Sequence, residues 1–505
     1  MSLNYNFIWL LCYLLVLVGL AGYGFHRLSI VYLYWKNRNN KPQPKARFQE
    51  LPVVTVQLPM FNEKFVVDRL LESVAALDYP QDKLEIQILD DSTDDTTEQC
   101  YRKVEELKSR GFDAVCIHRT DRTGFKAGAL EAATKVAKGE FLLILDADFV
   151  PEPDLLQKTI HFFTDENVGL VQTRWGHINR EYNLLTRIQG MYLDGHFAME
   201  QTARNRSGRF FTFNGTAGIW RKCVIGDAGG WSHDTLTEDM DLSYRVQLRG
   251  WRFIYLNDVV TPAELPVDMD GFKSQQHRWT KGSIQVCQKI LLDIWRSNAP
   301  LKAKVEATTH LTCNYSYLLL ALLCFLVYPI CTQLIPETET VFMWFVTVAL
   351  FFMTSVAVCI FYMSAQIVVR PKSWWKELPY LPLLLTLSVG MAVNNAKAVL
   401  EAIFGHQSAF VRTPKYGVDR KEDRRHVSQL KRNGYRAIKS VVIPVLEIAC
   451  GTFFLNLIII MIRQGHYLSP ILMIPFLGFY YTGFCSLGRM ISNLLPAKQT
   501  AKAKN

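Results

Sequence analysis

The 505-residue sequence predicts an α/β domain with a mostly parallel sheet, inserted between the helices of a multi-pass membrane protein. Two observations support this prediction. Several apolar runs are longer than the roughly 18 residues that indicate a membrane span, and they flank residues 26–314, which have soluble character. Within that segment, short apolar strands alternate with helical patterns, which is typical of a parallel sheet.

The first apolar run sets the expected orientation of the chain. The runs lie at about 7–25, 315–335, 341–369, 441–462 and 467–487, with a sixth at 378–404. We do not expect the first run to be a signal peptide, because "MSLNYN" carries no positive charge and the basic residues follow the run. Residues 26–47 contain six Lys or Arg and no acid, so the positive-inside rule places them and the following domain in the cytoplasm.

The run at 378–404 is the ambiguous one. Residues 405–440 hold ten Lys or Arg against three acids, which predicts a cytoplasmic loop. Crossings at 315–335 and 341–369 return the chain to the cytoplasm, so we expect 378–404 to be an interfacial or re-entrant helix. If 378–404 crossed the membrane instead, the basic loop would lie outside.

Charge and cysteine usage exclude several classes of protein. The net charge is +10 and the excess is juxtamembrane, which favours contact with anionic lipid headgroups over nucleic-acid binding. The 11 cysteines are scattered and form no C-x-x-C pair, so we expect neither a disulfide framework nor a zinc site.

Four apolar runs in the soluble segment are candidate strands, and each is followed by polar residues. The runs are "VVTVQL" (53–58), "EIQIL" (85–89), "AVCIH" (114–118) and "FLLIL" (141–145), with helical patterns at 64–77, near 94–109 and at 125–137. Ligands of parallel sheets bind outside the carboxyl ends of the strands. No G-x-G-x-x-G follows the first strand and no Walker motif occurs, so a nicotinamide cofactor or a Walker-type phosphate cradle is not supported.

Carboxylates follow the strands instead. Asp90 and Asp91 follow the second strand, and "LDADF" places Asp146 and Asp148 on one side of an extended segment. Two such carboxylates suit Mg²⁺ or Mn²⁺, which is typically held by one or two carboxylates plus substrate phosphates. A metal ion there would neutralise a leaving diphosphate, although D-x-D also occurs in many surface loops.

Three further stretches allow a structural and a functional interpretation. In "LTEDMDL", the acids Glu238, Asp239 and Asp241 either favour the first turn of a helix or supply a general base whose pKa a neighbouring carboxylate raises. Lys126 in "RTGFKAGAL" either reaches a phosphate or holds a carboxylate. "FNGTAGIWR" (213–221) allows the close approach of a flat ligand such as a sugar, or makes a tight turn.

The stretch "QQHRW" places Gln275, Arg278 and Trp279 on one helical face. Taken alone, this is a polar helix with one buried tryptophan. The apolar positions Ile284, Cys287, Leu291 and Trp295 that follow predict an amphipathic helix at the membrane surface.

Together these stretches resemble glycosyltransferase family 2, in its processive, inverting branch with a GT-A catalytic domain. The similarity is greatest to the cellulose-synthase-like A and C groups of plants, which make mannan, glucomannan or glucan backbones, and to their bacterial relatives. The matching stretches, in family order from about 59 to 279, are "PMFNEK", "QILDDSTD", "RTGFKAGAL", "LDADF", "LVQTRW", "FNGTAGIWR", "AGGW", "TEDMDL" and "QQHRW".

The resemblance implies a role for each candidate residue. Asp239 is the expected general base. The expected donor-binding residues are Asn62, Glu63, Asp90, Asp91, Lys126, Asp146 and Arg278, and the expected metal ligands are Asp146 and Asp148. The expected acceptor-binding residues are Trp279, Gln275, Asn214, Gly215 and Thr216. "FVRTPKYG" (410–417) resembles the F-x-V-T-x-K gating motif of cellulose synthases, although the spacing of its Val and Thr departs from that motif.

The implied protein is a hexosyltransferase of the plasma (inner) membrane or a Golgi-type membrane. It would use UDP-glucose or GDP-mannose to extend a β-glycan, by β-1,4 linkage, and would move the product across the bilayer. The alternatives are a single-transfer enzyme with a lipid acceptor and a transporter or receptor with an inert soluble domain. The expected domains are 1–50 (first helix and linker), 51–270 (catalytic), 271–310 (interfacial helices) and 311–505 (membrane region).

Overall fold

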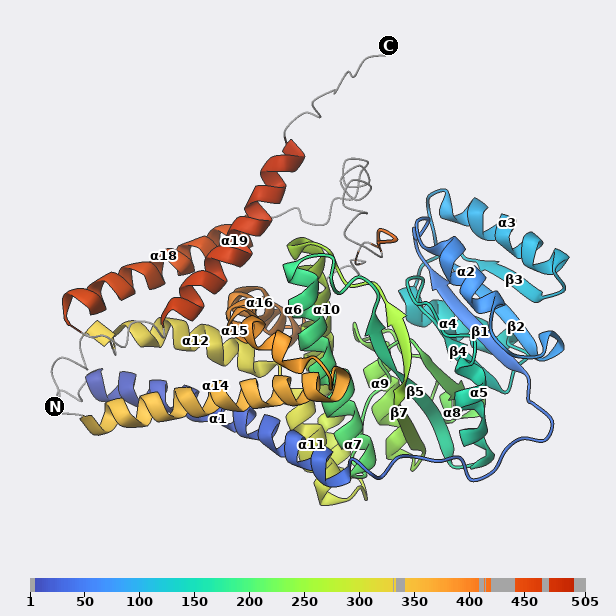
Figure 1. Ribbon diagram of the computed structural model, residues 1–505, viewed down its shortest axis with the longest axis horizontal. Coiled ribbons are helices and arrows are strands. Elements are labelled where there is room, and N and C mark those ends of the chain that lie inside the picture. The colour runs from blue at the N-terminus through green and yellow to red at the C-terminus, as the bar shows by residue number, and fades with distance from the viewer. Residues whose placement is uncertain are drawn as a thin grey trace, which may run out of the picture.

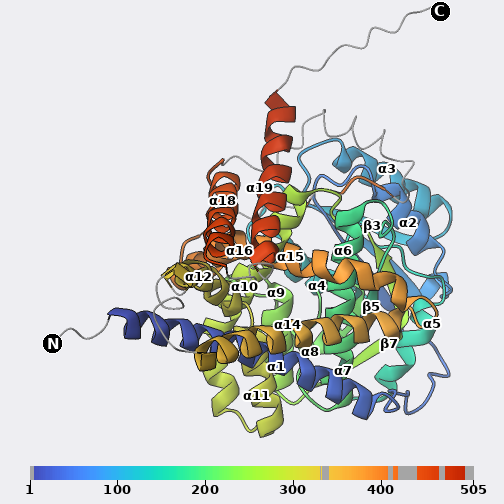
Figure 2. The same ribbon diagram turned by 60° about the vertical axis from the view of Figure 1, so that its left-hand side comes forward.

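The computed structural model describes residues 5–329, 331–332, 341–407, 413, 415–418, 441–465 and 472–494. An α/β domain lies at one end of a bundle of long helices (Figure 1). Three of those helices, α1 (Tyr5–Asn37), α12 (Tyr315–Pro329) and α14 (Val341–Val369), point away from the sheet, and α1 packs on both of the others (Figure 1 and Figure 2). The chain thus passes from the bundle into the sheet domain after α1 and returns to the bundle at α12.

A seven-stranded sheet in the order β3-β2-β1-β4-β6-β5-β7 forms the centre of the domain. The strands are β1 (Val54–Met60), β2 (Leu84–Asp90), β3 (Asp113–His118), β4 (Phe141–Ile144), β5 (Val168–His177), β6 (Gly218–Arg221) and β7 (Arg252–Ala263). Neighbours pair in parallel except β6, which runs antiparallel to both β4 and β5. The predicted mostly parallel sheet is therefore confirmed.

Helices cover both faces of the sheet. One face packs on α2 (Val67–Ala75), α3 (Thr96–Ser109) and α5 (Leu155–Thr159), through a core that includes Val56, Leu70 and Leu156. The other face packs on α4 (Phe125–Val136), α8 (Lys222–Asp227) and α9 (Glu238–Leu248) around the fully buried Trp220. Because both faces are covered, β1, β2 and β4 are buried along almost their whole length. β4 is apolar throughout, whereas β1 and β2 alternate apolar residues with buried polar ones, which pair across the two strands: Thr55 with Glu85, and Gln57 with Gln87.

The membrane region agrees in part with the predicted spans. Three helices of the described chain are long and apolar enough to cross a membrane, or up to five if each of two bent pairs is one span. One bent pair is the ambiguous run, which breaks between α15 (Leu381–Gly390) and α16 (Ala392–Ile403) with a bend of 41°. Such a bend suits a broken span or a re-entrant segment, and most of the basic loop 405–440 lies outside the described residues.

Two amphipathic helices join the sheet domain to the bundle. They are α10 (Met269–Arg296), which carries "QQHRW", and α11 (Leu301–Thr312). On the buried side of α10, Cys287, Ile290 and Ile294 pack on α9 and α11, and Ile284 packs on α16. Ile284 and Cys287 of the predicted stripe lie on this side, whereas Trp295 is 45% exposed. The position of the stripe at the membrane surface stays a prediction.

A buried ion cluster fixes the sheet domain to the membrane helices. Glu377, 1% exposed on the 3₁₀ helix that precedes α15, accepts hydrogen bonds from the guanidinium groups of Arg180 (3.0 Å) and Arg187 (3.0 and 3.2 Å). Beside it, Gln366 of α14 donates to the buried carboxylate of Asp194. Buried polar groups of the two parts thus satisfy each other, so the parts hold a defined relative position.

We expect Glu377→Gln to destabilise the protein by about 3 kcal/mol, because it leaves two arginines without their buried counter-charge. The melting temperature of the detergent-solubilised protein measures the effect. Glu105→Gln is the matched control, since Glu105 forms an exposed i,i+3 pair with Lys108 and such pairs contribute little. Equal melting temperatures for the two variants would show that the cluster does not hold the parts together.

Candidate active site

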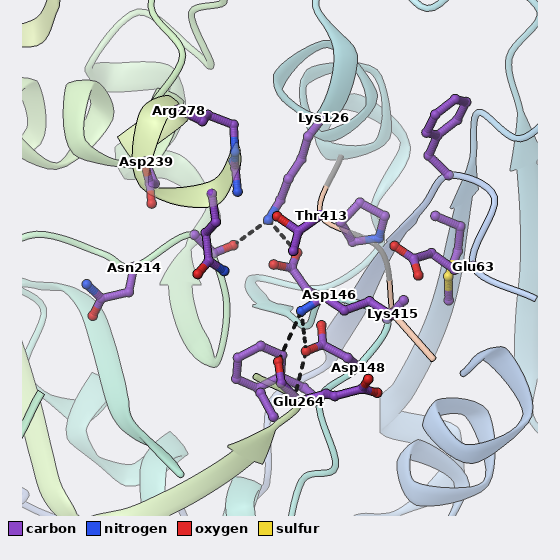
Figure 3. Close-up of a pocket in the computed structure, with 18 of the residues that line it drawn as sticks. Glu63, Lys126, Asp146, Asp148, Asn214, Asp239, Glu264, Arg278, Thr413 and Lys415 are labelled. Carbon is purple, nitrogen blue, oxygen red and sulfur yellow. Dashed lines mark hydrogen bonds and ion pairs between the residues drawn. The ribbon is translucent and has the colours of Figure 1, made fainter. Parts of the chain in front are cut away.

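The carboxyl ends of β1, β2 and β4 open into one cavity, whose lining also includes residues of α9 and α10. Figure 3 shows Lys126, Asp146, Asp148, Asp239 and Arg278 around it. The cavity is lined by the predicted residues Glu63, Asp91, Lys126, Asp146, Asp148, Asn214, Gly215, Asp239, Gln275, Arg278 and Trp279. These residues come from segments that are up to 216 positions apart in the chain, from 63 to 279. The fold therefore brings together most of the residues that the motifs had singled out.

Three predicted site residues are not among those that line the cavity. Asn62, in the left-handed region at φ 56°, accepts a hydrogen bond from the backbone of Thr93 and ties the loop after β1 to the loop after β2. Asp90 is fully buried and accepts from the Thr97 hydroxyl and the Ser92 backbone N–H. Both shape the loops that line the cavity, and their contact with a donor stays a prediction.

Thr216 is the third of these residues. It is fully buried, and its hydroxyl accepts a hydrogen bond from the backbone N–H of Asp146 at 2.8 Å. Thr216 therefore positions the first aspartate of "LDADF" and does not face an acceptor.

Lys126 holds the first carboxylate of the D-x-D pair. Its ammonium donates to Asp146 at 2.5 Å and to the backbone carbonyl of Gly215 at 2.8 Å. Burial opposes the charge on Lys126, but the carboxylates of Asp146, Glu238 and Asp239 outweigh burial, and the pKa of Lys126 is raised. Of the two interpretations for this lysine, the structure shows it holding a carboxylate.

Asp148 is held by residues from the far end of the chain. Its carboxylate accepts from the ammonium of Lys415 at 2.6 Å and from the backbone N–H of Glu264 at 3.0 Å. The carboxylate of Glu264 in turn accepts the backbone N–H groups of Tyr416, Gly417 and Val418. Residues 415–418 are thereby fastened across the cavity, and Thr413 also lines it.

Two carboxylates of the cavity fit part of the coordination sphere of a divalent cation, and a substrate would supply the remaining ligands. In the part of the chain that the structure describes, no cluster of three or more His, Cys, Asp or Glu side chains is arranged to hold a metal. Asp146 and Asp148 offer two carboxylates at one strand end, which matches how Mg²⁺ or Mn²⁺ is bound together with phosphate oxygens. These two residues would hold the ion, and a diphosphate would supply the remaining oxygens.

Asp239 lies at the N-terminus of α9 and opens onto the cavity. Burial, followed by the negative charge of Glu238, raises the pKa of Asp239 to about 7, against smaller opposing effects of the Met240 N–H, Lys126 and Arg278. A carboxyl group with a pKa near neutrality is suited to exchanging protons with a ligand. Glu238 and Asp239 of "TED" therefore begin α9, and the carboxylate of Asp239 can also act as a base.

Trp279 separates this cavity from a second one. Its ring packs with Trp175, Leu193 and Phe197, and the same four residues line the second cavity, which runs between α1, α12 and α14. Asn214 and Asp239 lie on both walls. The site therefore has two openings, one toward the sheet edge and one toward the membrane helices.

Sequence reasoning missed several lining residues. Glu264 carried no motif signal, because an isolated charge near a strand end is common. Arg122 begins the motif "RTGFKAGAL", but Lys126 alone was singled out from it. Lys415 and Thr413 fall within the stretch that resembles the gating motif, and that resemblance was the available clue. His196 of the second cavity lies between the quoted motifs and had no signal of its own.

The fold is that of the GT-A glycosyltransferases. The structure of the mannosyltransferase PcManGT from Pyrobaculum calidifontis, in complex with GDP-Man and Mn²⁺, superimposes with a TM-score of 0.55. The alignment covers 78% of this chain and 99% of that chain at 20% sequence identity. At that identity the likeness describes the fold alone.

The sequence comparisons name the family. Residues 52–282 match the model for glycosyltransferase like family 2, and residues 218–465 match the model for cellulose synthase. The chain therefore carries a glycosyltransferase family 2 domain and a cellulose synthase domain, which confirms the resemblance read from the motifs.

Two curated relatives are named mannosyltransferases. Glucomannan 4-beta-mannosyltransferase 2 of Arabidopsis thaliana is 42% identical over 286 residues, and glucomannan 4-beta-mannosyltransferase 1 of Oryza sativa subsp. japonica is 40% identical over 277 residues. Each alignment covers 54% of this chain and 53% of the relative. The chain thus matches about half the length of these relatives.

Removing a carboxylate from the cation site is the first test of the site. We expect Asp148→Asn to weaken the Mn²⁺-dependent binding of a nucleoside diphosphate at least about 10-fold, because the cation loses one of two ligands. Calorimetric titration with GDP and with UDP, in Mn²⁺ and in EDTA, measures the effect. Asp258→Asn is the control, since Asp258 is exposed and pairs only with Lys41 among the described ion pairs. Binding that is unaffected by EDTA would refute the metal assignment.

Proposed function

We propose that the protein is a processive, inverting glycosyltransferase that transfers a hexose from a nucleotide sugar to a growing β-glycan. One observation carries the proposal. Asp239 and Trp279 lie on the wall shared by a polar cavity at the sheet edge and a second cavity among the membrane helices. A donor in the first cavity and an acceptor in the second would meet at a basic carboxylate.

The relatives suggest which donor to test first. The curated relatives are named glucomannan 4-beta-mannosyltransferases, and the structural neighbour was solved with GDP-Man. We therefore propose GDP-mannose as the donor and a β-1,4 linkage, with UDP-glucose as the second donor to compare. The two D-x-D carboxylates, with Mg²⁺ or Mn²⁺, would bind the diphosphate that both donors contain.

The proposed chemistry is a single displacement. The acceptor hydroxyl attacks the anomeric carbon from the side opposite the diphosphate, so an α-linked donor gives a β-linked product. Asp239 takes the hydroxyl proton, and its raised pKa makes it a stronger base than an ordinary aspartate. Glu238 sustains this basicity because its charge disfavours ionisation of its neighbour.

Cationic groups face the position of the leaving diphosphate. The ammonium of Lys126 lies at 2.5 Å from Asp146, and the guanidinium of Arg278 lines the same cavity. A guanidinium binds phosphate oxygens with charge-assisted hydrogen bonds. A bound divalent cation would act as a Lewis acid on the leaving diphosphate. These groups offset the negative charge that develops as the sugar departs.

The second cavity suits a glycan that leaves through the membrane region. It begins at Trp279 and is lined by aromatic rings such as Tyr192, Tyr317 and Phe361. Sugar rings pack their apolar faces on aromatic rings while their hydroxyls stay at the edges. We propose that the product moves through this cavity, and that the catalytic domain is cytoplasmic, as the basic linker at 26–47 indicates.

Product length tests this proposal against single transfer to a lipid. Purified protein incubated with radiolabelled GDP-mannose or UDP-glucose should yield a ladder of long β-glycan that a linkage-specific glycanase digests. A single labelled lipid, extracted into organic solvent, would show instead that the enzyme transfers one sugar to a lipid acceptor.

The pH profile should report Asp239. Because the folded protein raises its pKa to about 7, the basic form is lost as pH falls through 7. We expect kcat/KM to fall about tenfold per pH unit below that value, while donor binding, followed by calorimetry, changes far less. Asp239→Asn should lower the rate by roughly 10²–10⁴ above pH 7 and remove this dependence, so that the two rates converge as the pH falls. A profile that stays flat down to pH 5 would contradict the assignment of the base.

Trp279 should act on the acceptor alone. Trp279→Ala removes an aromatic face and no proton-transfer group, so we expect polymer formation to fall about tenfold more than release of free sugar by donor hydrolysis. Trp295→Ala is the control, because Trp295 lies on the same helix with a 45% exposed side chain. If Trp279→Ala lowers polymer and free sugar in equal proportion, the tryptophan is structural.

A further inference from the structure

A π-helix forms part of the wall of the second cavity. It spans Gly195–Gln201 between α6 (Leu184–Asp194) and α7 (Thr202–Arg206). Hydrogen bonds of a π-helix run from i to i+5, and such segments are frequent at functional sites. The wider turn places residues i, i+4 and i+5 on one face, so His196, Glu200 and Gln201 share a side.

Gly195 permits this segment to approach the membrane helices. A Cβ atom at this position would lie 2.7 Å from the ring of Phe361 and 2.8 Å from the ring of Tyr362, both on α14. Such distances are too short for carbon atoms. The glycine therefore lets α14 pack directly on the π-helix and fixes its shared face relative to the cavity.

Glu200 determines which nitrogen of His196 carries the proton. Its carboxylate is held by the guanidinium of Arg27 on α1 and by that of Arg204 at 3.5 Å. It also lies 2.9 Å from Nδ1 of His196. A carboxylate accepts hydrogen bonds, so Nδ1 of the ring donates and Nε2 is left as the acceptor.

The acceptor nitrogen of His196 orients Asn214. The side-chain amide nitrogen of Asn214 lies 3.1 Å from Nε2 of His196 and donates to it. At the other end of the same amide, Gln201 donates to the side-chain oxygen of Asn214 at 2.9 Å. The amide therefore has one orientation, set from both ends by residues of the π-helix.

The ring of His196 stays neutral in this setting. Burial, together with the charges of Arg204 and Arg27, lowers the pKa of His196 well below its ordinary value. A protonated ring would point an N–H at the amide N–H of Asn214, so the charged form also conflicts with the geometry. Over the working pH range the orientation of Asn214 is thus constant.

The oriented amide lies beside the proposed base. Gly215 follows Asn214 at φ +80°, and a Cβ atom there would lie 3.0 Å from a carboxylate oxygen of Asp239. Asn214 itself lines both cavities. One N–H and one lone pair of its amide remain for a ligand after the bonds to His196 and Gln201.

We infer that His196 is a positioning residue for the acceptor sugar: it orients the amide of Asn214 so that the amide binds a hydroxyl of the terminal sugar next to Asp239. This inference rests on the proposed function, because it assumes that the second cavity receives the glycan. It identifies a network of hydrogen bonds and ion pairs that connects Arg27 of α1, through Glu200 and His196 of the π-helix, with Asn214.

Two substitutions separate the two nitrogens of His196. The side-chain oxygen of His196→Gln takes the place of Nε2 and keeps an acceptor for Asn214, whereas His196→Asn keeps only the contact with Glu200. His196→Ala removes both contacts, and His406→Ala, at an exposed position, is the control. The measurements are KM for a β-1,4 manno-oligosaccharide, the ratio of polymer to free sugar, and calorimetric affinities for the oligosaccharide and for GDP.

We expect His196→Ala and His196→Asn to weaken oligosaccharide binding and raise its KM about 5- to 10-fold, the effect of one misplaced hydrogen-bonding group. The Gln variant should recover most of that loss, and GDP affinity should change less than twofold. Equal behaviour of the Asn and Gln variants, or a parallel loss of GDP affinity, would overturn the inference.

The calorimetric binding measurements test the role of His196 independently of the proposed function. If the wild-type protein transfers sugar from no donor but binds the oligosaccharide, the proposed function fails and the affinities of the three variants still decide the role of His196. If the wild-type protein binds no oligosaccharide, the acceptor role of His196 is refuted.

Discussion

The charge balance at the end of β4 is the interaction on which the site depends. Two carboxylates on one side of the chain at this strand end repel each other, and here each is matched by an ammonium: Asp146 by Lys126 and Asp148 by Lys415. Lys126 also binds the carbonyl of Gly215 at 2.8 Å, so the same cation fixes α4, the end of β4 and the turn beside Asp239. A buried charge without its partner is strongly destabilising, so these elements keep their relative places. The cavity is shaped by this pairing before any ligand arrives.

Much of the fold could be predicted because its signals are local. β1, β2 and β4 are short buried strands and β3 is a partly exposed edge strand, and apolar runs locate all four to within a few residues. β5, β6 and β7 carried no strand prediction, because glycine, proline or polar residues interrupt their apolar positions. The sequence did not specify which residues of α10 are buried against α11, because the packing of Ile294 on α11 is a long-range contact. Where tertiary contacts decide, the chain pattern alone is not sufficient.

The residues of the candidate site also differ in how far the sequence could predict them. Residues with a chemical reason to stand at a strand end, such as Asp146, Asp148 and Asp239, were found because their type and position suffice to indicate chemistry. Asp90 and Thr216 carry equally strong motif signals, yet both are fully buried and form hydrogen bonds that hold the loops of the cavity, as the partly exposed Asn62 also does. A motif marks residues that must stay together, and a residue that supports the wall is under the same constraint as one that lines it. Lys415 was hard to predict for the opposite reason, since it lies 267 residues from its partner.

One helix connects the chemistry to the membrane region. The inner face of α10 presents Arg278 and Trp279 to the cavities, and its other faces form ion pairs with the membrane helices. Lys281 pairs with Glu401 of α16, and Lys273 pairs at 2.5 Å with Glu447 of α18 (Val442–Arg463). Both lysines are almost fully buried, so neither pair separates without exposing an unmatched charge to apolar surroundings. Rotation of α10 about its axis, or its sliding along α16, is therefore opposed at two points on either side of "QQHRW". The wall between the two cavities is in this way set by the packing of the membrane helices, and a displacement of α16 or α18 would be transmitted directly to Trp279.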